Sequence, residues 1–142
     1  MTNRILSIKK VYNIPFNLPE IEKWYSENTG DGFEIITEQH KYQLLIENEQ
    51  QCCEKFGLDT DDNFEDYIGA DVLSIEKLVT DLSTPEDTEI GDVNKVLFLR
   101  IHTSSGEITF KVYNCHNGYY SHTVVYLVKD GETIITKDVE EL

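Results

Sequence analysis

No stretch of the sequence approaches the ~20 consecutive apolar residues that a membrane-spanning helix needs. The first ten residues, MTNRILSIKK, have no long apolar segment and no small-residue cleavage pattern after their charges, so no secretory signal is expected there. Cysteine is scarce: there are three, two of them adjacent, which argues against the disulfide framework of small secreted domains. We therefore expect a soluble, unprocessed protein in a reducing cytoplasm, without membrane association.

Signatures of known catalytic sites are also missing. There is no Gly-x-Ser-x-Gly, no His-Glu-x-x-His and no glycine-rich phosphate loop. Cys115 and His122 could in principle act as nucleophile and base, but little else in the sequence supports that chemistry. A calcium loop beginning at Asp59 is excluded, because its sixth position is Phe64 instead of glycine and its twelfth is Ala70 instead of glutamate. We expect a protein that is not an enzyme.

The hydrophobic pattern predicts an α+β fold, mostly antiparallel β-sheet of six to eight strands, in one compact domain spanning residues 1–142. Strands are expected at residues 4–12, 33–37 and 42–47, and a four-stranded C-terminal meander at 96–101, 108–112, 119–128 and 133–136. Turns within the meander are expected at 104–106 and at Asp130-Gly131. For residues 70–79 strand and helix compete, and the strand is favoured.

Two helices are expected beside the sheet. The first follows Pro15, with Asn17 as its cap, Pro19 in its first turn and Gly30 after its end. The second is short, covers residues 49–56 and ends at the following glycine. It would place the two adjacent cysteines in a tight element directly after a strand.

The segment NCHNGYYSH, residues 114–122, gathers one cysteine, two histidines and a turn signal in nine residues. Asn117-Gly118 is the dipeptide typical of a two-residue hairpin, because both turn positions need positive φ. In that hairpin, positions whose numbers sum to 235 pair, and the Cα atoms of Cys115 and His122 lie diagonally on one face, about 7 to 8 Å apart. His116 then lies on the opposite face, although a loop one residue longer would reverse the choice between the histidines.

Four side chains, Cys52, Cys53, Cys115 and His122, match the number and type of ligands that a structural zinc ion needs. Such a site would cross-link two parts of the domain and contribute folding free energy. The spacing is unusual, because the first two cysteines are adjacent and about sixty residues separate the two pairs. The alternative is that the cysteines are small buried hydrophobic residues.

Negative charge is the strongest feature of the composition: 27 acidic residues against 12 basic ones give a net charge of −15. Residues 59–92 hold twelve acids and the single base Lys77, which is −11 in 34 residues. This charge repels free nucleic acid and attracts basic surfaces, although acidity can also serve solubility alone. The residues expected to bind such a partner are Asp59, Asp61, Asp62, Glu65, Asp66, Glu86, Asp87 and Glu89.

Three motifs, QCCEKFG, YIGADVLSIE and NGYYSH, together resemble a family of small proteins from phages and mobile elements of Firmicutes. That family shares a Cys-Cys-Glu element and an Asn-Gly-Tyr-Tyr-Ser turn, and the likeness covers residues 42–128. The size and acidity of the chain also look like those of type II anti-CRISPR proteins, some of which bind Cas9 and stop it loading target DNA. At least one of these inhibitors is a metalloprotein, so the resemblance also implies zinc.

The resemblance and the charge together lead to a first hypothesis. The protein would be a phage-derived inhibitor that binds Cas9, or another basic nucleic-acid-handling protein, in the cytoplasm of a bacterial host cell. Direct nucleic-acid binding is not expected, and a monomer is favoured. The alternative is a phage module that binds a nucleotide signal through the tyrosines near residues 113–126, which acidity disfavours because phosphates need basic contacts.

Overall fold

Nine β-strands make up most of the described chain, and neighbouring strands all pair antiparallel. The computed structural model describes residues 2–15, 29–48, 55–81, 93–116 and 123–142. The strands are β1 (Ile5–Pro15), β2 (Thr29–Thr37), β3 (Lys41–Glu47), β4 (Lys55–Asp59), β5 (Val72–Asp81), β6 (Val93–Thr103), β7 (Gly106–His116), β8 (Thr123–Asp130) and β9 (Thr133–Glu141). One turn of 3₁₀ helix, η1 (Phe64–Asp66), is the only helical element in these residues.

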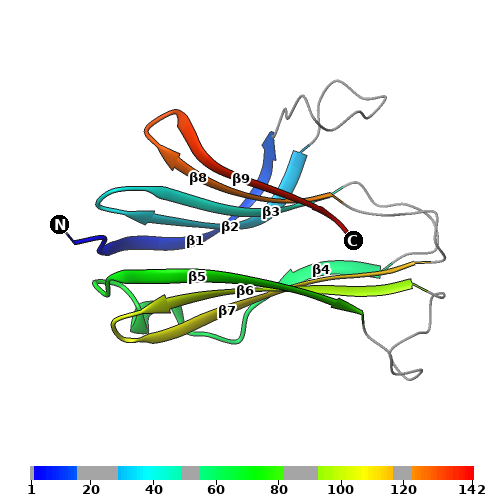
Figure 1. Cartoon of the computed structure of the whole chain (residues 1–142), viewed down its shortest axis with the longest axis horizontal. Coiled ribbons are helices and arrows are strands. Elements are labelled where there is room, and N and C mark those ends of the chain that lie inside the picture. The colour runs from blue at the N-terminus through cyan, green and yellow to red at the C-terminus, as the bar shows by residue number, and fades with distance from the viewer. Residues whose placement is uncertain (1, 16–28, 49–54, 82–92, 117–122) are drawn as a thin grey trace.

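The strands form two sheets that lie one above the other (Figure 1). The five-stranded sheet has the order β1-β2-β3-β8-β9, and the four-stranded sheet has the order β4-β7-β6-β5. The chain passes from the first sheet to the second after β3 and returns after β7. Most strands therefore pair with the strand before or after them in the sequence. Between β1 and β9 the chain crosses from one sheet to the other only twice.

Alternate side chains from both sheets meet in one hydrophobic core. In β7, Ile108, Phe110 and Val112 are at most 1% exposed, because residues two apart point to the same face of a strand. The rings of Phe110 and Phe33, one from each sheet, have centroids 4.8 Å apart at the centre of this core. Its other buried members are Ile5, Ile35, Tyr42, Leu44, Ile46, Leu97, Leu99, Ile101, Val124, Tyr126, Val128 and Leu142.

The central strands β3 and β8 are buried on both faces. Their outward-pointing side chains contribute to a second buried cluster, which consists of Val11, Leu45, Val125 and Leu127. Polar groups on this face pair with one another: Gln43 Nε2 donates to Glu34 Oε2 at 2.8 Å, and Lys9 Nζ lies 3.5 Å from Glu34 Oε1. Burial on both faces explains why these strands are mainly hydrophobic instead of alternating.

One strand of the smaller sheet, β5, contacts both edges of the larger one. Near its start, the main-chain N–H of Val72 donates to the carbonyl oxygen of Asn3 at 3.1 Å, just before β1. Further along, the ammonium of Lys77 lies within ion-pair distance of Asp138 and Glu140 on β9. The two sheets are therefore joined by polar contacts as well as by their shared core.

The expected α+β class is wrong, because the described chain is almost entirely antiparallel β-sheet and contains no α-helix. The first expected helix lies outside the described residues except at its end, where Thr29 and Gly30 begin β2. The second is wrong at its end, since Lys55 and Phe56 belong to β4 and pair with β7. Local helix signals there are outweighed by pairing with a buried strand. Within the described ranges, no helix is long and apolar enough to cross a membrane.

The strand favoured for residues 70–79 is confirmed as β5. The turns at 104–106 and at Asp130-Gly131 are also confirmed, since they connect β6 to β7 and β8 to β9. The expected four-stranded meander is wrong, because these two hairpins belong to different sheets. Short turns are encoded locally, whereas the choice of sheet depends on which faces pack together.

The expected hairpin register, in which positions sum to 235, is also wrong where the structure describes it. Both edges of β7 are occupied, and Cys115 lies between Lys55 of β4 and Asn94 of β6. Strand β8 pairs instead with β3 and β9 in the other sheet. The Asn117-Gly118 turn itself lies outside the described residues.

Candidate functional site

An exposed acidic loop connects β4 to β5 at one end of the four-stranded sheet. We define the acidic loop as residues 59–66, and its side chains Asp59, Asp61, Glu65 and Asp66 are all exposed. Four carboxylates within eight residues create a strongly negative surface, which attracts cations and basic protein surfaces. Of the five residues of this loop that the sequence predicted to bind a partner, these four are available to do so.

The fifth, Asp62, instead holds the loop in place. Its Oδ2 accepts a hydrogen bond from the main-chain N–H of Thr109 on β7 at 2.8 Å and another from Thr60 Oγ1 at 3.4 Å. Thr60 Oγ1 is also 2.8 Å from the carbonyl oxygen of Thr109. The loop is therefore fastened to the main chain of β7, and Asp62 has a structural role that its charge alone did not reveal.

The other end of the loop is anchored in the core. Asn63 caps η1, since its side chain accepts from the N–H of Glu65 at 3.2 Å. The ring of Phe64 packs edge-on against Phe33, with centroids 5.4 Å apart. Hydrogen bonds and an aromatic anchor thus hold the backbone that carries the exposed carboxylates, so their positions are set before any partner binds.

Tyr67 closes the loop on the side of β7. Its hydroxyl donates to the carbonyl oxygen of Glu107 at 2.9 Å. Burial raises the pKa of this hydroxyl, and the negative charge of Asp62 raises it further. The phenol therefore stays protonated at neutral pH and acts as a hydrogen-bond donor.

A hollow of about 390 Å³ lies beside the acidic loop. It is lined by Asp59, Thr60, Asp61, Asp62, Phe98, Thr109 and Lys111. Three carboxylates against one lysine make this hollow suited to a cationic group and unsuited to a phosphate. The remaining residues predicted to bind a partner, Glu86, Asp87 and Glu89, lie outside the described residues.

Of the four predicted zinc ligands, only Cys115 lies in the described part of the chain, as a residue of β7. Cys52, Cys53 and His122 lie outside it. The described residues contain no group of three or more histidine, cysteine or acidic side chains that could hold a metal ion. The register pairs Cys115 with Lys55, which is two residues along the chain from Cys53. The pairing of β4 with β7 therefore places Cys115 beside a residue that is close in sequence to Cys53, although about sixty residues separate these two cysteines along the chain.

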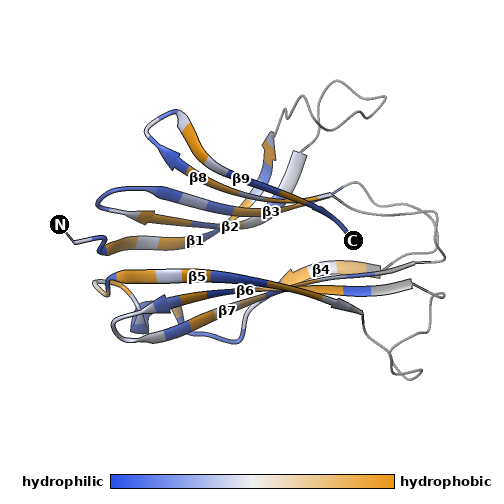
Figure 2. Cartoon of the chain, viewed as in Figure 1, coloured by the Kyte–Doolittle hydropathy of each residue, from blue (hydrophilic) through white to orange (hydrophobic). Residues whose placement is uncertain are grey.

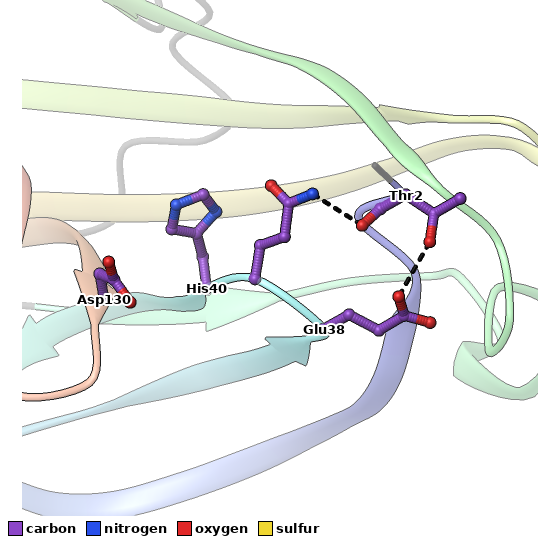
Figure 3. A pocket seen from close by; sticks show the side chains of 5 residues that line it. Thr2, Glu38, His40 and Asp130 are labelled. Carbon is purple, nitrogen blue, oxygen red and sulfur yellow. Dashed lines mark hydrogen bonds between the residues drawn. The ribbon is translucent and has the colours of Figure 1, made fainter.

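A second hollow, of about 630 Å³, opens at the turn between β2 and β3. It is lined by Thr2, Glu38, Gln39, His40 and Asp130 (Figure 3). Thr2 Oγ1 donates to Glu38 Oε2 at 2.8 Å, and Gln39 Nε2 donates to the carbonyl oxygen of Thr2 at 2.7 Å. The described residues that line this hollow include two carboxylates and no lysine or arginine, which does not suit the phosphates of a nucleotide.

The sequence analysis did not predict this second hollow. His40 follows β2 in a tight turn, where its main-chain N–H donates to Thr37 Oγ1 at 2.9 Å. The polar run of Glu38, Gln39 and His40 between two apolar strands marks the turn. The sequence does not indicate that Asp130, from the β8-β9 turn, completes the lining.

The comparisons with known proteins show one family. The model of a domain of unknown function, DUF7448, matches residues 3–126. This match covers most of the chain, including eight of the nine strands in whole or part, and the chain therefore belongs to that family. No curated protein and no solved structure matches it.

Proposed function

We propose that this member of the DUF7448 family is a binding protein without enzymatic activity, which inhibits a nucleic-acid-handling protein by covering a basic surface. Cas9 is the partner that the resemblance to anti-CRISPR proteins suggests. The acidic loop would occupy the positively charged channel that follows the nucleic-acid backbone, and so prevent DNA loading or cleavage. The observation that supports this proposal is the exposed and firmly anchored set of Asp59, Asp61, Glu65 and Asp66.

Anchoring matters because binding costs free energy whenever flexible groups become ordered. The loop backbone is already held by Asp62 and Thr60 on β7 and by Phe64 in the core. Only the exposed carboxylate side chains would lose freedom on binding, which lowers the ordering cost. Opposite charges also accelerate encounter between the two proteins, in a manner that salt screens.

The proposal includes a structural zinc ion held by Cys52, Cys53, Cys115 and His122. Thiolates and imidazole are the ligands that zinc prefers, and four of them complete a structural site. The pairing of Cys115 with Lys55 supports it, because chain connectivity keeps Cys53 within reach of that pair. When bound, zinc would stabilise the fold and take no part in a reaction.

The proposed function is tested by Cas9 cleavage and DNA gel-shift assays with increasing amounts of the protein. We expect loss of DNA binding and of cleavage. The double variant Asp61→Lys and Glu65→Lys should weaken inhibition at least about tenfold, since each lost charge pair at an interface affects binding by about 1 kcal/mol or more.

The matched control is Asp130→Lys and Glu132→Lys, which reverses two exposed charges at the β8-β9 turn. It changes the net charge by the same amount and should inhibit as the wild type does. Intact DNA binding and cleavage with excess wild-type protein would refute the proposal for Cas9. Equal losses in the two variants, or inhibition unaffected by high salt, would refute the role of the acidic loop.

A further inference from the structure

We propose that the free edge of β5 binds an extended segment of a partner protein, rich in basic and apolar residues, as an additional strand of the four-stranded sheet. This inference goes beyond the proposed function and does not depend on the acidic loop. Strand β5 is the last strand of the order β4-β7-β6-β5, so among the described strands only β6 pairs with it along its length. Strand addition is a common way in which proteins recognise extended peptides.

The edge is open over most of its length. Alternate residues of an edge strand direct their N–H and C=O groups away from the neighbouring strand. In the described part of the chain, the last main-chain hydrogen bond on the edge of β5 that faces away from β6 is at Val72, whose N–H donates to the carbonyl oxygen of Asn3. From Leu73 to Asp81, up to nine residues of β5 are available for pairing with an added strand through main-chain hydrogen bonds.

Exposed apolar side chains flank this edge. Leu73 is 67% exposed, Leu78 52% and Val79 39%, although all three belong to one strand. Figure 2 shows β5 as hydrophobic towards its start, hydrophilic in its middle and hydrophobic again beyond. An exposed edge of this length and composition is rare in proteins without a partner, because it invites pairing. The partner segment should therefore place apolar residues opposite both ends of β5.

Charge selects a basic segment over a second copy of this chain. Glu76 is exposed on β5, where its Oε1 lies 3.8 Å from Arg100 and 3.0 Å from His102 of β6, and Lys77 is neutralised by Asp138 and Glu140. The chain as a whole carries a net charge of −15, which favours a basic partner. A lysine or arginine opposite Glu76 would be favourable across the strands. Two-fold pairing of β5 with itself, centred on the strand, would instead set Glu76 opposite Glu76 or Lys77 opposite Lys77. Like charges directly opposite are destabilising, and two chains of charge −15 repel one another.

The test uses the full chain and a blocked ten-residue peptide of alternating lysine and valine. Amide hydrogen exchange, measured by NMR, should slow about tenfold or more at alternate residues of β5 when the peptide is added. The same peptide with every main-chain nitrogen methylated lacks donors on both edges and should give no such protection. A peptide of alternating glutamate and valine should also give none, because its charge is wrong.

A pair of proline variants then identifies the edge. Leu78→Pro and Val79→Pro change consecutive residues, whose N–H groups point to opposite sides of the strand. The variant that removes a free-edge N–H should keep its melting temperature close to that of the wild type but lose peptide protection, since proline is tolerated at an edge. Alanine at the same position retains the N–H and should restore protection.

The proposal fails if the peptide protects no amides of β5, or protects β4 or other strands equally. It also fails if the N-methylated peptide protects as well as the unmodified one, a result that does not depend on any variant folding. Self-association of the chain through β5, detected by sedimentation without peptide, would replace the proposed partner with a second copy. Reversal of the acidic-loop charges at Asp61 and Glu65 should leave the β5 protection in place.

Discussion

Lys77 of β5 donates a hydrogen bond from Nζ to Glu140 Oε1 of β9 at 2.6 Å, and the same ammonium lies 3.0 Å from Asp138 Oδ1. The lysine side chain is only 23% exposed. This clasp links β5, an edge strand of one sheet, to β9, an edge strand of the other. In the sequence, Lys77 is simply the one base in an acidic segment.

Replacing Lys77 with methionine should lower the free energy of unfolding by about 1 kcal/mol. The substitution keeps most of the apolar side chain but leaves two carboxylates without their partner, and their partial exposure limits the cost. Urea unfolding measures the change. Lys129→Met is the control, because it removes the same charge from β8; an equal loss in both variants would show that net charge, and not the clasp, is responsible.

The same clasp should weaken at high pH. Partial burial acts to lower the pKa of Lys77, but hydrogen bonds to Glu140 and Asp138 outweigh it, and the pKa is raised. The stabilisation is therefore complete below the ordinary lysine pKa of about 10.4 and is lost as the pH rises through the higher value in the folded chain. Unfolding of wild type and Lys77→Met should differ by a constant amount up to about pH 10 and converge above it. Convergence already below about pH 9 would contradict this assignment.

Asp62 and Asp61 are neighbours with different roles, which single alanine variants should separate. Asp62→Ala removes the acceptor for the Thr109 N–H and should cost about 1 to 2 kcal/mol of stability. Asp61→Ala, at an exposed position, should change stability by less than about 0.5 kcal/mol. Thermal or urea unfolding distinguishes them. Equal stability of the two variants would mean that Asp62 does not hold the acidic loop.

Two glycines in strands should respond differently to alanine. A Cβ at Gly32 would lie 1.8 Å from the main-chain oxygen of Leu44, so Gly32→Ala must displace backbone in the centre of the five-stranded sheet. A loss above about 3 kcal/mol is expected. A Cβ at Gly57 would meet the phenol end of the Tyr113 ring, with the hydroxyl oxygen at 2.6 Å and Cζ at 2.8 Å, so a side chain and not the backbone has to shift. Gly57→Ala should therefore cost about 1 kcal/mol, and a larger loss than at Gly32 would contradict the packing.

Metal analysis of the purified protein should find about one zinc ion per chain, as a site of four ligands requires. A chelator should lower the melting temperature, because zinc binding contributes folding free energy. Cys115→Ser should reduce the zinc content, whereas His116→Ala should retain it. The site would be ruled out if the purified protein contained no metal and its melting temperature did not change with chelator. If His116→Ala lost zinc and His122→Ala did not, His116 would be the histidine ligand in place of His122.

Local sequence patterns predicted several elements correctly, whereas features that depend on contacts between distant residues were missed. The alternation of Ile108, Phe110 and Val112 predicted an inward-facing strand, and Asp130-Gly131 predicted a hairpin turn, because both signals lie within a few residues. The helix expected at residues 49–56 failed at Phe56, where pairing with β7 decides the conformation. The candidate site shows the same division: exposed acids were predictable from charge, but the anchoring of Asp62 by Thr109 was not.

The sequence by itself determined a strand-rich chain with a concentrated negative charge, since these follow from residue type and short-range spacing. Only the tertiary structure decided how the strands are divided between two sheets, because that depends on which apolar faces pack against each other. It also decided that Lys77 joins β5 to β9 across sixty residues of sequence, and that in the described residues the edge of β5 facing away from β6 is open beyond Val72. Such pairings arise only when distant strands are brought together by the burial of their shared core.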